Sequence, residues 1–197
     1  MTMRVERQVI PDILLVTIDR FCDPRGWFRE TYNGRTFADA GIGASFMQDN
    51  ESCSEKAGTV RGLHYQLRPF AQDKLVRVLR GAILDVTVDL RTGSPTYGRH
   101  VAVQLDADRD QVLFIPVGFA HGFCTLADHT TVSYKVSQLY APPYERGVRW
   151  DDPALGIRWP VAREQAVVSQ KDTTWPRFDA VPQSDLFRHI PAKEFAQ

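Results

Sequence analysis

Several ionisable or polar residues stand on or beside stretches that have the pattern of strands, where an inward side chain is normally apolar. They are His64, Lys74, Asp85, His121 and Tyr134. Burying a charge costs free energy unless the charge is paired or serves a site. An imidazole can act as a general base, a phenol as an acid, and an ammonium group can stabilise an oxyanion. If these side chains share one barrel interior, that interior is a reaction chamber and not a packed core.

His64 gains significance from Asp172, which ends a Ser-Gln-Lys-Asp segment. A carboxylate bonded to one ring nitrogen of a histidine leaves the other nitrogen as a base. Each residue also has an ordinary interpretation. A lone histidine is usually structural, a sheet tyrosine such as Tyr134 is usually half-buried with a bonded hydroxyl, and Asp85 can pair with Lys74. The residues alone leave these alternatives open.

The candidates for anion binding are Arg25, Arg61 and Lys171. A guanidinium group suits phosphate because its planar fork makes two parallel hydrogen bonds. Arg61 lies just before His64 in the sequence, so we expect it at the mouth of the barrel. Each of these residues taken alone is more often a solvated surface charge. The aromatic residues that could stack on a nucleobase are Trp27, Phe28 and Tyr140.

The elements that must position these residues are mainly strands. Apolar residues recur with a period of two, and Gly and Pro are spread along the chain as turn signals. The expected strands cover 13–18, 27–32, 74–79, 84–90, 101–105, 112–115 and 132–136. Helix is sparse, with a short one expected at 35–40 and a weak amphipathic stretch at 184–195. The pattern predicts a mainly β sandwich or barrel with a few short helices.

Length and composition indicate one globular domain over 1–197. The 24 Lys and Arg residues balance 24 Asp and Glu residues, which argues against a general nucleic-acid or membrane-surface binder. No apolar run approaches the roughly 20 residues of a membrane span, and the N-terminal residues lack a signal-peptide core. We therefore expect a cytoplasmic protein with no nucleic acid and no membrane among its partners. The widely spaced cysteines, expected as buried free thiols, are Cys22, Cys53 and Cys124.

The string PxGxxHGF at 116–123 resembles the second motif of the cupin superfamily, whose members are small double-stranded β-helix barrels. Many cupins use the histidine of this motif, here His121, as a metal ligand. The first cupin motif carries an HxH pair, but Gln66 stands here in place of the second histidine, and Lys74 follows where a carboxylate is expected. A cation repels a divalent metal, so the sequence predicts no metal site. A metal-dependent cupin oxygenase remains an alternative.

Taken together, the ordered motifs resemble the dTDP-4-dehydrorhamnose 3,5-epimerase family over about 9–175. The motifs are DPRGWFRE at 23–30, QDN at 48–50, VRGLHYQ at 60–66, KLVRV at 74–78, PVGFAHGF at 116–123, ERGVRWDDP at 145–153 and SQKD at 169–172. The resemblance implies a cupin-type double-stranded β-helix, also called a jelly-roll barrel, with a core at about 9–175. Residues 176–197 would form a C-terminal tail.

The resemblance implies epimerisation at C3 and C5 of dTDP-4-dehydro-6-deoxy-D-glucose to dTDP-4-dehydro-L-rhamnose, in deoxysugar biosynthesis. The C4 ketone acidifies both carbons, so a proton can leave through an enolate and return on the opposite face, without a cofactor. By resemblance His64 is the proton acceptor, Asp172 its orienting partner, Tyr134 the proton donor and Lys74 the enolate stabiliser. The implied substrate-binding residues are Arg25, Glu30, Gln48, Asn50, Arg61, Asp85, His121, Tyr140, Glu145 and Lys171.

The implied partners are a dTDP-linked 4-keto-6-deoxyhexose and a second copy of the chain, in a homodimer with N-terminal strand exchange. Arg25 and Glu30 would then serve the partner's site. Two further alternatives are a mono-functional 3- or 5-epimerase and a non-catalytic sugar-nucleotide-binding barrel. The epimerase hypothesis predicts that one cavity holds the side chains of His64, Lys74, Asp85, His121 and Tyr134. It also predicts a His64–Asp172 distance of about 2.6–3.2 Å, with Arg61 and Lys171 at the cavity mouth.

Overall fold

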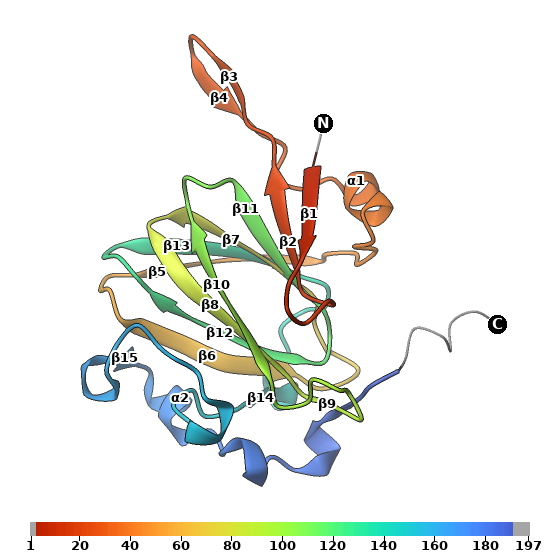
Figure 1. The fold of residues 1–197 in the computed structure, drawn as a ribbon, viewed down its shortest axis with the longest axis vertical. Coiled ribbons are helices and arrows are strands. Elements are labelled where there is room, and N and C mark those ends of the chain that lie inside the picture. The colour runs from red at the N-terminus through yellow and green to blue at the C-terminus, as the bar shows by residue number, and fades with distance from the viewer. Residues whose placement is uncertain (1–2, 191–197) are drawn as a thin grey trace, which may run out of the picture.

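The computed structural model describes residues 3–190, and its body consists of facing β-sheets (Figure 1). One sheet has the order β1-β2-β11-β7-β13-β5, with bounds Met3–Arg7, Leu14–Ile18, Gln111–Ile115, Lys74–Arg80, Thr130–Val136 and Gln48–Ser54. The other has the order β10-β8-β12-β6-β14, with bounds His100–Asp106, Ala82–Asp89, Phe119–Thr125, Thr59–Gln66 and Glu145–Gly147. All neighbours on these paths are antiparallel, while β15 (Val167–Val168) runs parallel beside β6. This arrangement confirms the predicted mainly β class.

Smaller elements complete the chain. Short paired strands are β3 (Phe21–Asp23) with β4 (Gly26–Phe28), and β9 (Arg91–Thr92) with β16 (Phe187–Arg188). The α-helices are α1 (Gly34–Asp39) and α2 (Gln170–Thr174). Single 3-10 turns are η1 (Pro142–Tyr144), η2 (Pro153–Leu155), η3 (Arg163–Gln165), η4 (Phe178–Ala180) and η5 (Gln183–Asp185). Within residues 3–190, no helix has the length and apolar character that crossing a membrane requires.

The space between the sheets is apolar over most of its depth. Its buried cluster includes Leu15, Val76, Val78, Leu113 and Val132, each contributed by one face of a strand. Because strand side chains alternate, the opposite face of β2, β7 and β11 points outward, where it packs against α1 together with side chains of the neighbouring strand β1. The alternation thus gives each strand of this sheet a lumen face and an outer face.

The C-terminal segment covers the outer face of the second sheet. Val181 and Phe187 are buried there against Val86, Val88 and Leu90 of the β8 region. In Figure 1 this segment, drawn in blue, wraps below β6 and β14. The predicted tail is therefore part of the packed structure as far as residue 190, and residues 191–197 lie outside the described part.

The helix predicted at 35–40 is confirmed by α1, whose N-cap Asn33 accepts bonds from the next two backbone amides. The helical stretch predicted at 184–195 is wrong over its described part. There, η5 is followed by β16, because the Phe187 side chain is buried and its backbone pairs with β9. The strand predicted at 27–32 is shorter than expected and ends at Phe28.

Glycines allow close contact between the strands that carry the two histidines of the site. Gly62 on β6 has a φ of 122°, and a Cβ there would lie 2.5 Å from the Cα of Gly122 on β12. A Cβ on Gly122 would in turn lie 2.6 Å from the carbonyl oxygen of Arg61. Only glycine fits such a backbone approach. These glycines lie where the register of β6 with β12 shifts, next to the cross-strand pair of His64 and His121.

Candidate active site

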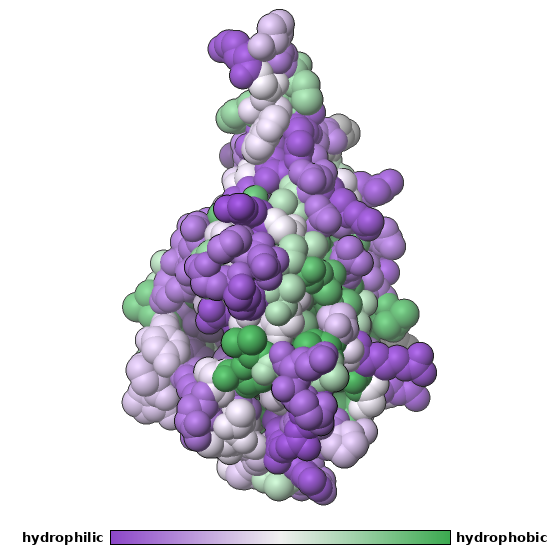
Figure 2. Space-filling view, turned by 90° about the vertical axis from the view of Figure 1, so that its left-hand side faces the viewer, coloured by the Kyte–Doolittle hydropathy of each residue, from purple (hydrophilic) through white to green (hydrophobic). Residues whose placement is uncertain are grey.

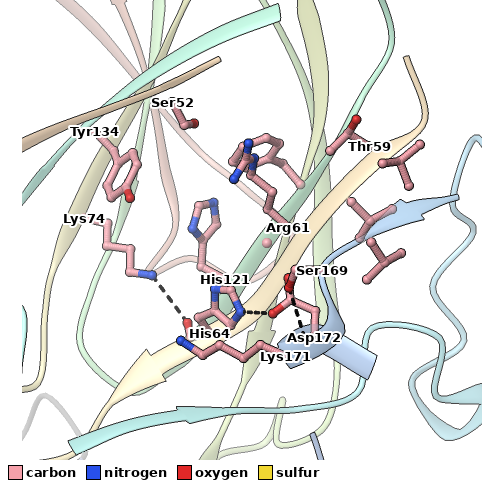
Figure 3. Close-up of a pocket in the computed structure, with 15 residues that line it drawn as sticks. Ser52, Thr59, Arg61, His64, Lys74, His121, Tyr134, Ser169, Lys171 and Asp172 are labelled. Atoms are coloured by element: carbon pink, nitrogen blue, oxygen red, sulfur yellow. Dashed lines mark hydrogen bonds and ion pairs between the residues drawn. The ribbon is translucent and has the colours of Figure 1, made fainter. Parts of the chain in front are cut away.

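A cavity of about 440 Å³ opens between the sheets at the end where the polar strand residues gather (Figure 3). His64 on β6 and His121 on β12 are cross-strand partners on one side of it. Lys74 on β7 and Tyr134 on β13 reach it from the opposite sheet. These side chains share the cavity as predicted. Asp85, which was expected beside them, does not line it.

Strand periodicity explains why Lys74 and Tyr134 face the lumen. Lys74 is the first residue of β7, and the buried Val76 and Val78 follow it on the same face. Tyr134 stands between Val132 and Val136, which are also buried. The polar groups therefore lie at the open end of an otherwise apolar interior, which forms the floor of the cavity.

His64 and Asp172 form a close pair, with 2.5 Å between Nε2 and Oδ1. Asp172 lies on α2, is buried, and also accepts a bond from the backbone N–H of Gly62. Burial alone would raise the pKa of Asp172, but the hydrogen bond and charge of His64 and the Gly62 bond together lower it. An ionised carboxylate requires a proton on Nε2, so Nδ1 is the nitrogen left to act as a base.

His121 and Asp85 form a second pair, with 2.8 Å between Nε2 and Oδ2. Asp85 is fully buried, and its pairing corrects the interpretation that it bonds Lys74. The register of β8 with β12 sets Asp85 opposite Phe123, beneath His121, so the imidazole covers the carboxylate. Burial lowers the pKa of His121, although the charge and hydrogen bond of Asp85 oppose that shift.

Lys74 is a buried ammonium group with few fixed contacts. Its Nζ donates a long bond of 3.4 Å to the backbone carbonyl of His64. Burial lowers the pKa of Lys74 from 10.5 to about 8, against the opposing charges of Asp85 and Glu145. Burial likewise raises the pKa of the Tyr134 phenol, which stays protonated near neutral pH. The cavity therefore presents a cation and a phenol that are free to meet a ligand.

A second cavity of about 280 Å³ shares His64, Lys74 and Tyr134 with the first. The predicted binding residues that line it are Gln48, Asn50, Tyr140 and Glu145. The Gln48 amide donates to Asn50 at 2.7 Å, and the Tyr140 hydroxyl donates to Glu145 at 2.7 Å. The two cavities together form a groove with the histidine, lysine and tyrosine at its middle.

Arg61 and Lys171 line the first cavity and are both exposed, as expected for its mouth. Arg61 is held by bonds to the Ser54 hydroxyl and the Cys53 carbonyl, both at 3.1 Å. Lys171 forms an ion pair with Glu145. Burial would raise the pKa of Glu145, but Lys171 and the Tyr140 hydroxyl lower it. Positive charge therefore flanks the groove where an anionic ligand would enter.

Arg25 and Glu30 are not brought to this groove within the chain. Arg25 lies in the hairpin of β3 and β4, where it is exposed and bonded to Asp23 at 2.6 Å. Glu30 follows the hairpin and contacts Asn33. Figure 2 shows the hairpin as a narrow projection above the body of the molecule. The contribution of Arg25 and Glu30 to the site of a partner subunit stays a prediction.

Ser52 and Ser169 line the first cavity and were missed from the sequence. Ser52 follows Gln48 and Asn50 at alternating positions of β5, so the period of two could have found it. Its hydroxyl is buried without a hydrogen-bond partner among the described residues. Ser169 caps α2 by accepting the backbone N–H of Asp172, and this helix is too short to give a periodic signal.

Metal-ligand chemistry finds little support in the donor set. Across residues 3–190, no group of three or more His, Cys, Asp or Glu side chains is arranged to hold a metal ion. Each histidine of the cavity already contacts a carboxylate through Nε2, and Lys74 adds a positive charge. Such a set fits proton transfer beside a developing anion.

Comparison with known proteins agrees with this geometry. The family model of dTDP-4-dehydrorhamnose 3,5-epimerase matches residues 7–180. The chain belongs to this family. A dTDP-4-dehydrorhamnose 3,5-epimerase of Sinorhizobium fredii is 47% identical over 175 residues, which cover 89% of each chain.

Solved structures extend the comparison to the fold. The dTDP-6-deoxy-D-glucose-3,5-epimerase of Legionella pneumophila, in complex with dTDP-4-keto-L-rhamnose, superposes with a TM-score of 0.92. It is 36% identical, and the match covers 96% of this chain and 100% of that chain. A 3'-monoepimerase of Streptomyces bikiniensis, in complex with dTDP-quinovose, gives a TM-score of 0.80 at 35% identity, over 87% of this chain and 86% of that chain. The fold of this epimerase-family chain is thus the cupin-type barrel.

Proposed function

We propose that this enzyme epimerises C3 and C5 of dTDP-4-dehydro-6-deoxy-D-glucose to give dTDP-4-dehydro-L-rhamnose. The observation that carries the proposal is the meeting of His64, Lys74 and Tyr134 in one cavity, from facing sheets. Membership of the family supports the substrate and the reaction. It also favours epimerisation over a metal-dependent oxygenase and over a non-catalytic binding barrel.

The proposed reaction is a pair of proton transfers. Nδ1 of His64 removes the proton from a carbon next to the ketone, and the electron pair of that bond moves into the C4 carbonyl. Lys74 donates a hydrogen bond to the enolate oxygen, whose charge develops only along the reaction. Tyr134 then returns a proton to the same carbon from the opposite face, which inverts it. Exchange with water then removes the proton from Nδ1 of His64 and returns a proton to the Tyr134 phenolate before the second carbon reacts.

We further propose that the two cavities divide the nucleotide sugar between them. Arg61 and Lys171 supply positive charge for the diphosphate, and Tyr140 is an exposed aromatic ring able to stack on thymine. His121 contacts the sugar as a neutral imidazole, and Asp85 acts by holding that ring. This division keeps the sugar ketone between Lys74 and His64.

The deciding experiment is NMR of the dTDP-keto-sugar with enzyme in deuterated water. We expect deuterium at both C3 and C5 and the L-rhamno product. Exchange at one carbon only would assign a mono-functional 3- or 5-epimerase, an alternative supported by the likeness to the Streptomyces bikiniensis monoepimerase. Tight dTDP binding without any exchange would overturn the enzymatic proposal and leave a sugar-nucleotide-binding barrel.

We also propose a homodimer in which the β3–β4 hairpin reaches the partner, so that Arg25 and Glu30 complete the neighbouring site. The hairpin exposes Phe21, Trp27 and Phe28, and such apolar residues on a projection suit a protein interface. The guanidinium groups of Arg20 and Arg29 lie 4.7 and 4.9 Å from the centroid of the Trp27 ring, and both also bond Asp110. These contacts give the base of the hairpin a defined shape.

Mixing two inactive variants tests the shared site. Arg25→Ala and His64→Ala homodimers should each be inactive, and exchange of their subunits should restore about a quarter of wild-type activity, because half of the dimers then hold one intact site. A monomer in light scattering, or no recovery after proven subunit exchange, would overturn the proposal.

A cytoplasmic location is proposed as well, and the cysteines support it. The expected burial of these thiols holds for Cys124 but is wrong for Cys22 and Cys53, which are free and exposed because they lie in the hairpin and on an outward position of β5. Free, exposed thiols suit a reducing compartment, and cell fractionation tests this location.

A further inference from the structure

We propose that Trp175 is a positioning residue of the reaction: its indole fixes the Asp172 carboxylate and, through it, the His64 ring. The inference rests on the proposed role of His64 as the base. Trp175 follows α2 and does not line either cavity described above. It therefore acts behind the reacting groups.

The indole shares one carboxylate oxygen with the histidine. Nε1 of Trp175 donates to Oδ1 of Asp172 at 3.3 Å, and this is the oxygen that lies 2.5 Å from Nε2 of His64. The other oxygen, Oδ2, accepts the Gly62 N–H at 3.3 Å. Donors on both oxygens fix the plane of the carboxylate. Without the indole, His64 would be the only residue among 3–190 that bonds Oδ1.

The indole ring also packs beside His64. The two ring centroids are 6.1 Å apart at an interplanar angle of 68°, an edge-on contact. Gly147 on β14 is the cross-strand partner of His64, and a Cβ at Gly147 would lie 2.5 Å from the indole carbons. The indole thus occupies the space of the missing side chain, directly next to the strand that carries the base.

The indole matters because the element that carries Asp172 is short. Asp172 lies on a helix of only five residues outside the barrel, 108 positions after His64 in the sequence. The titratable groups around the pair are Lys171 on α2, Glu145 on β14, Lys74 on β7, His121 on β12 and Arg61 on β6. None of these bonds Oδ1 among the described residues. The indole N–H is the neutral donor that keeps the carboxylate aimed at the ring, and it also helps to lower the pKa of Asp172.

The test is Trp175→Phe, which removes the N–H donor and keeps an aromatic ring. A hydrogen bond to a charged group is worth enough to lower kcat about tenfold. KM should stay unchanged, because Lys171 still faces an aromatic ring, as it now does at 5.7 Å. The acid limb of the kcat profile should move to higher pH, since a carboxylate with one donor fewer holds the His64 imidazolium more strongly.

The matched control is Trp159→Phe. Trp159 donates Nε1 to the Trp150 carbonyl at 2.8 Å and lies outside both cavities, so the chemical change is the same. We expect wild-type kcat and an unmoved acid limb in this variant. If Trp175→Phe behaves like the control, the indole only packs and the inference is overturned.

A second variant keeps the test valid if Trp175→Phe folds poorly. Gly147→Ala retains the indole but forces it away from its place, and the same fall in kcat and shift of the acid limb are expected. An unchanged profile in folded Gly147→Ala would contradict the inference. His64→Ala distinguishes failure of the proposed function from failure of the role of Trp175. If that variant still exchanges solvent deuterium, the base assignment fails; if it is inactive while both other variants are normal, only the role of Trp175 fails.

Discussion

The cavity holds two histidine–carboxylate pairs that differ in their surroundings. In the first, the His64 side chain is 30% exposed and its partner Asp172 comes from a helix outside the barrel. In the second, the side chains of His121 and Asp85 are 8% and 0% exposed, and both belong to neighbouring strands of one sheet. The histidines themselves are cross-strand partners. Chemically similar pairs thus stand side by side with different access to solvent.

The difference shows how burial divides the roles of like residues. A base must release its proton to water between turnovers, and the partly exposed His64 can do so. His121 is buried beside Lys74, and burial lowers its pKa, so a second positive charge beside the ammonium is disfavoured. With its Nε2–H facing Asp85, a neutral His121 can accept a hydrogen bond from a substrate hydroxyl at Nδ1, and its lowered pKa disfavours uptake of a proton from the sugar. The first pair is thus suited to transfer protons and the second to hold the site in shape.

The largest expected effect separates the two histidines directly. His64→Ala should lower solvent exchange into the sugar by about 10²–10⁴-fold, the usual contribution of a general base, while dTDP still binds. In His121→Ala the fall in exchange rate should be at least tenfold smaller than in His64→Ala. This variant should instead be less stable, because the buried Asp85 loses its hydrogen bond, which lowers the free energy of unfolding by about 1–3 kcal/mol. Exchange measured by NMR and urea unfolding check both. Equal loss of activity in the two variants would break the comparison.

The carboxylates give the next largest effect. Asp172→Asn should lower kcat about 10²-fold, because an amide does not stabilise the imidazolium that forms when His64 takes the proton. Asp85→Asn should lower kcat less than tenfold at pH 7, because the amide oxygen that replaces the carboxylate still accepts the His121 N–H. Steady-state rates of both variants test this order. A reversed order would assign the base to the second pair.

Much of the lumen face could be predicted from the sequence, because alternation is a local property. Lys74 and Tyr134 share the faces of Val76 and Val132, and the structure places them in the cavity. The pairing of Asp85 was out of reach. Alternation turns its side chain inward, but the choice between Lys74 and His121 depends on the register of β8 with β12, which no local pattern encodes.

The outer support of the site was predictable only by resemblance. Asp172 meets His64 across 108 residues, because the C-terminal segment folds back over β6. Helix α2 has five residues, too few for periodicity to indicate a helix. The prediction of a helix at 184–195 was wrong for a related reason. The backbone of β16 in this segment forms its hydrogen bonds with β9, a strand far away in the sequence.

The pairs should also differ in how they influence Lys74. Because burial sets the pKa of Lys74 at about 8, kcat/KM should fall as pH rises above this value and the ammonium loses its proton. The charge of Asp85 raises the pKa of Lys74, so Asp85→Asn should move this alkaline limb to lower pH. Asp172→Asn, the matched control, should lose activity with the limb in place. A limb that stays fixed in Asp85→Asn would show that the second pair does not act on the lysine.

The smallest effect concerns stability and sharpens the role of the buried pair. The pKa of His121 in the folded chain lies below its ordinary value of 6.5. Just below pH 6.5 the His121 side chain is therefore protonated in the unfolded chain but still neutral in the folded chain. Stability from this group is therefore present above about pH 6.5 and is lost as pH falls below it. Asp172 and Glu145, whose pKa values are also lowered, lose their contributions only below about pH 4.5 and do not interfere. Between pH 7 and 5, the Tm of His121→Gln should fall less steeply than that of wild type, by a few degrees, since each kcal/mol shifts Tm by about 2–4 °C. Parallel melting curves would mean that His121 accepts its proton as readily in the folded chain as in the unfolded one, and the division between a proton-transferring pair and a neutral pair would lose its electrostatic basis.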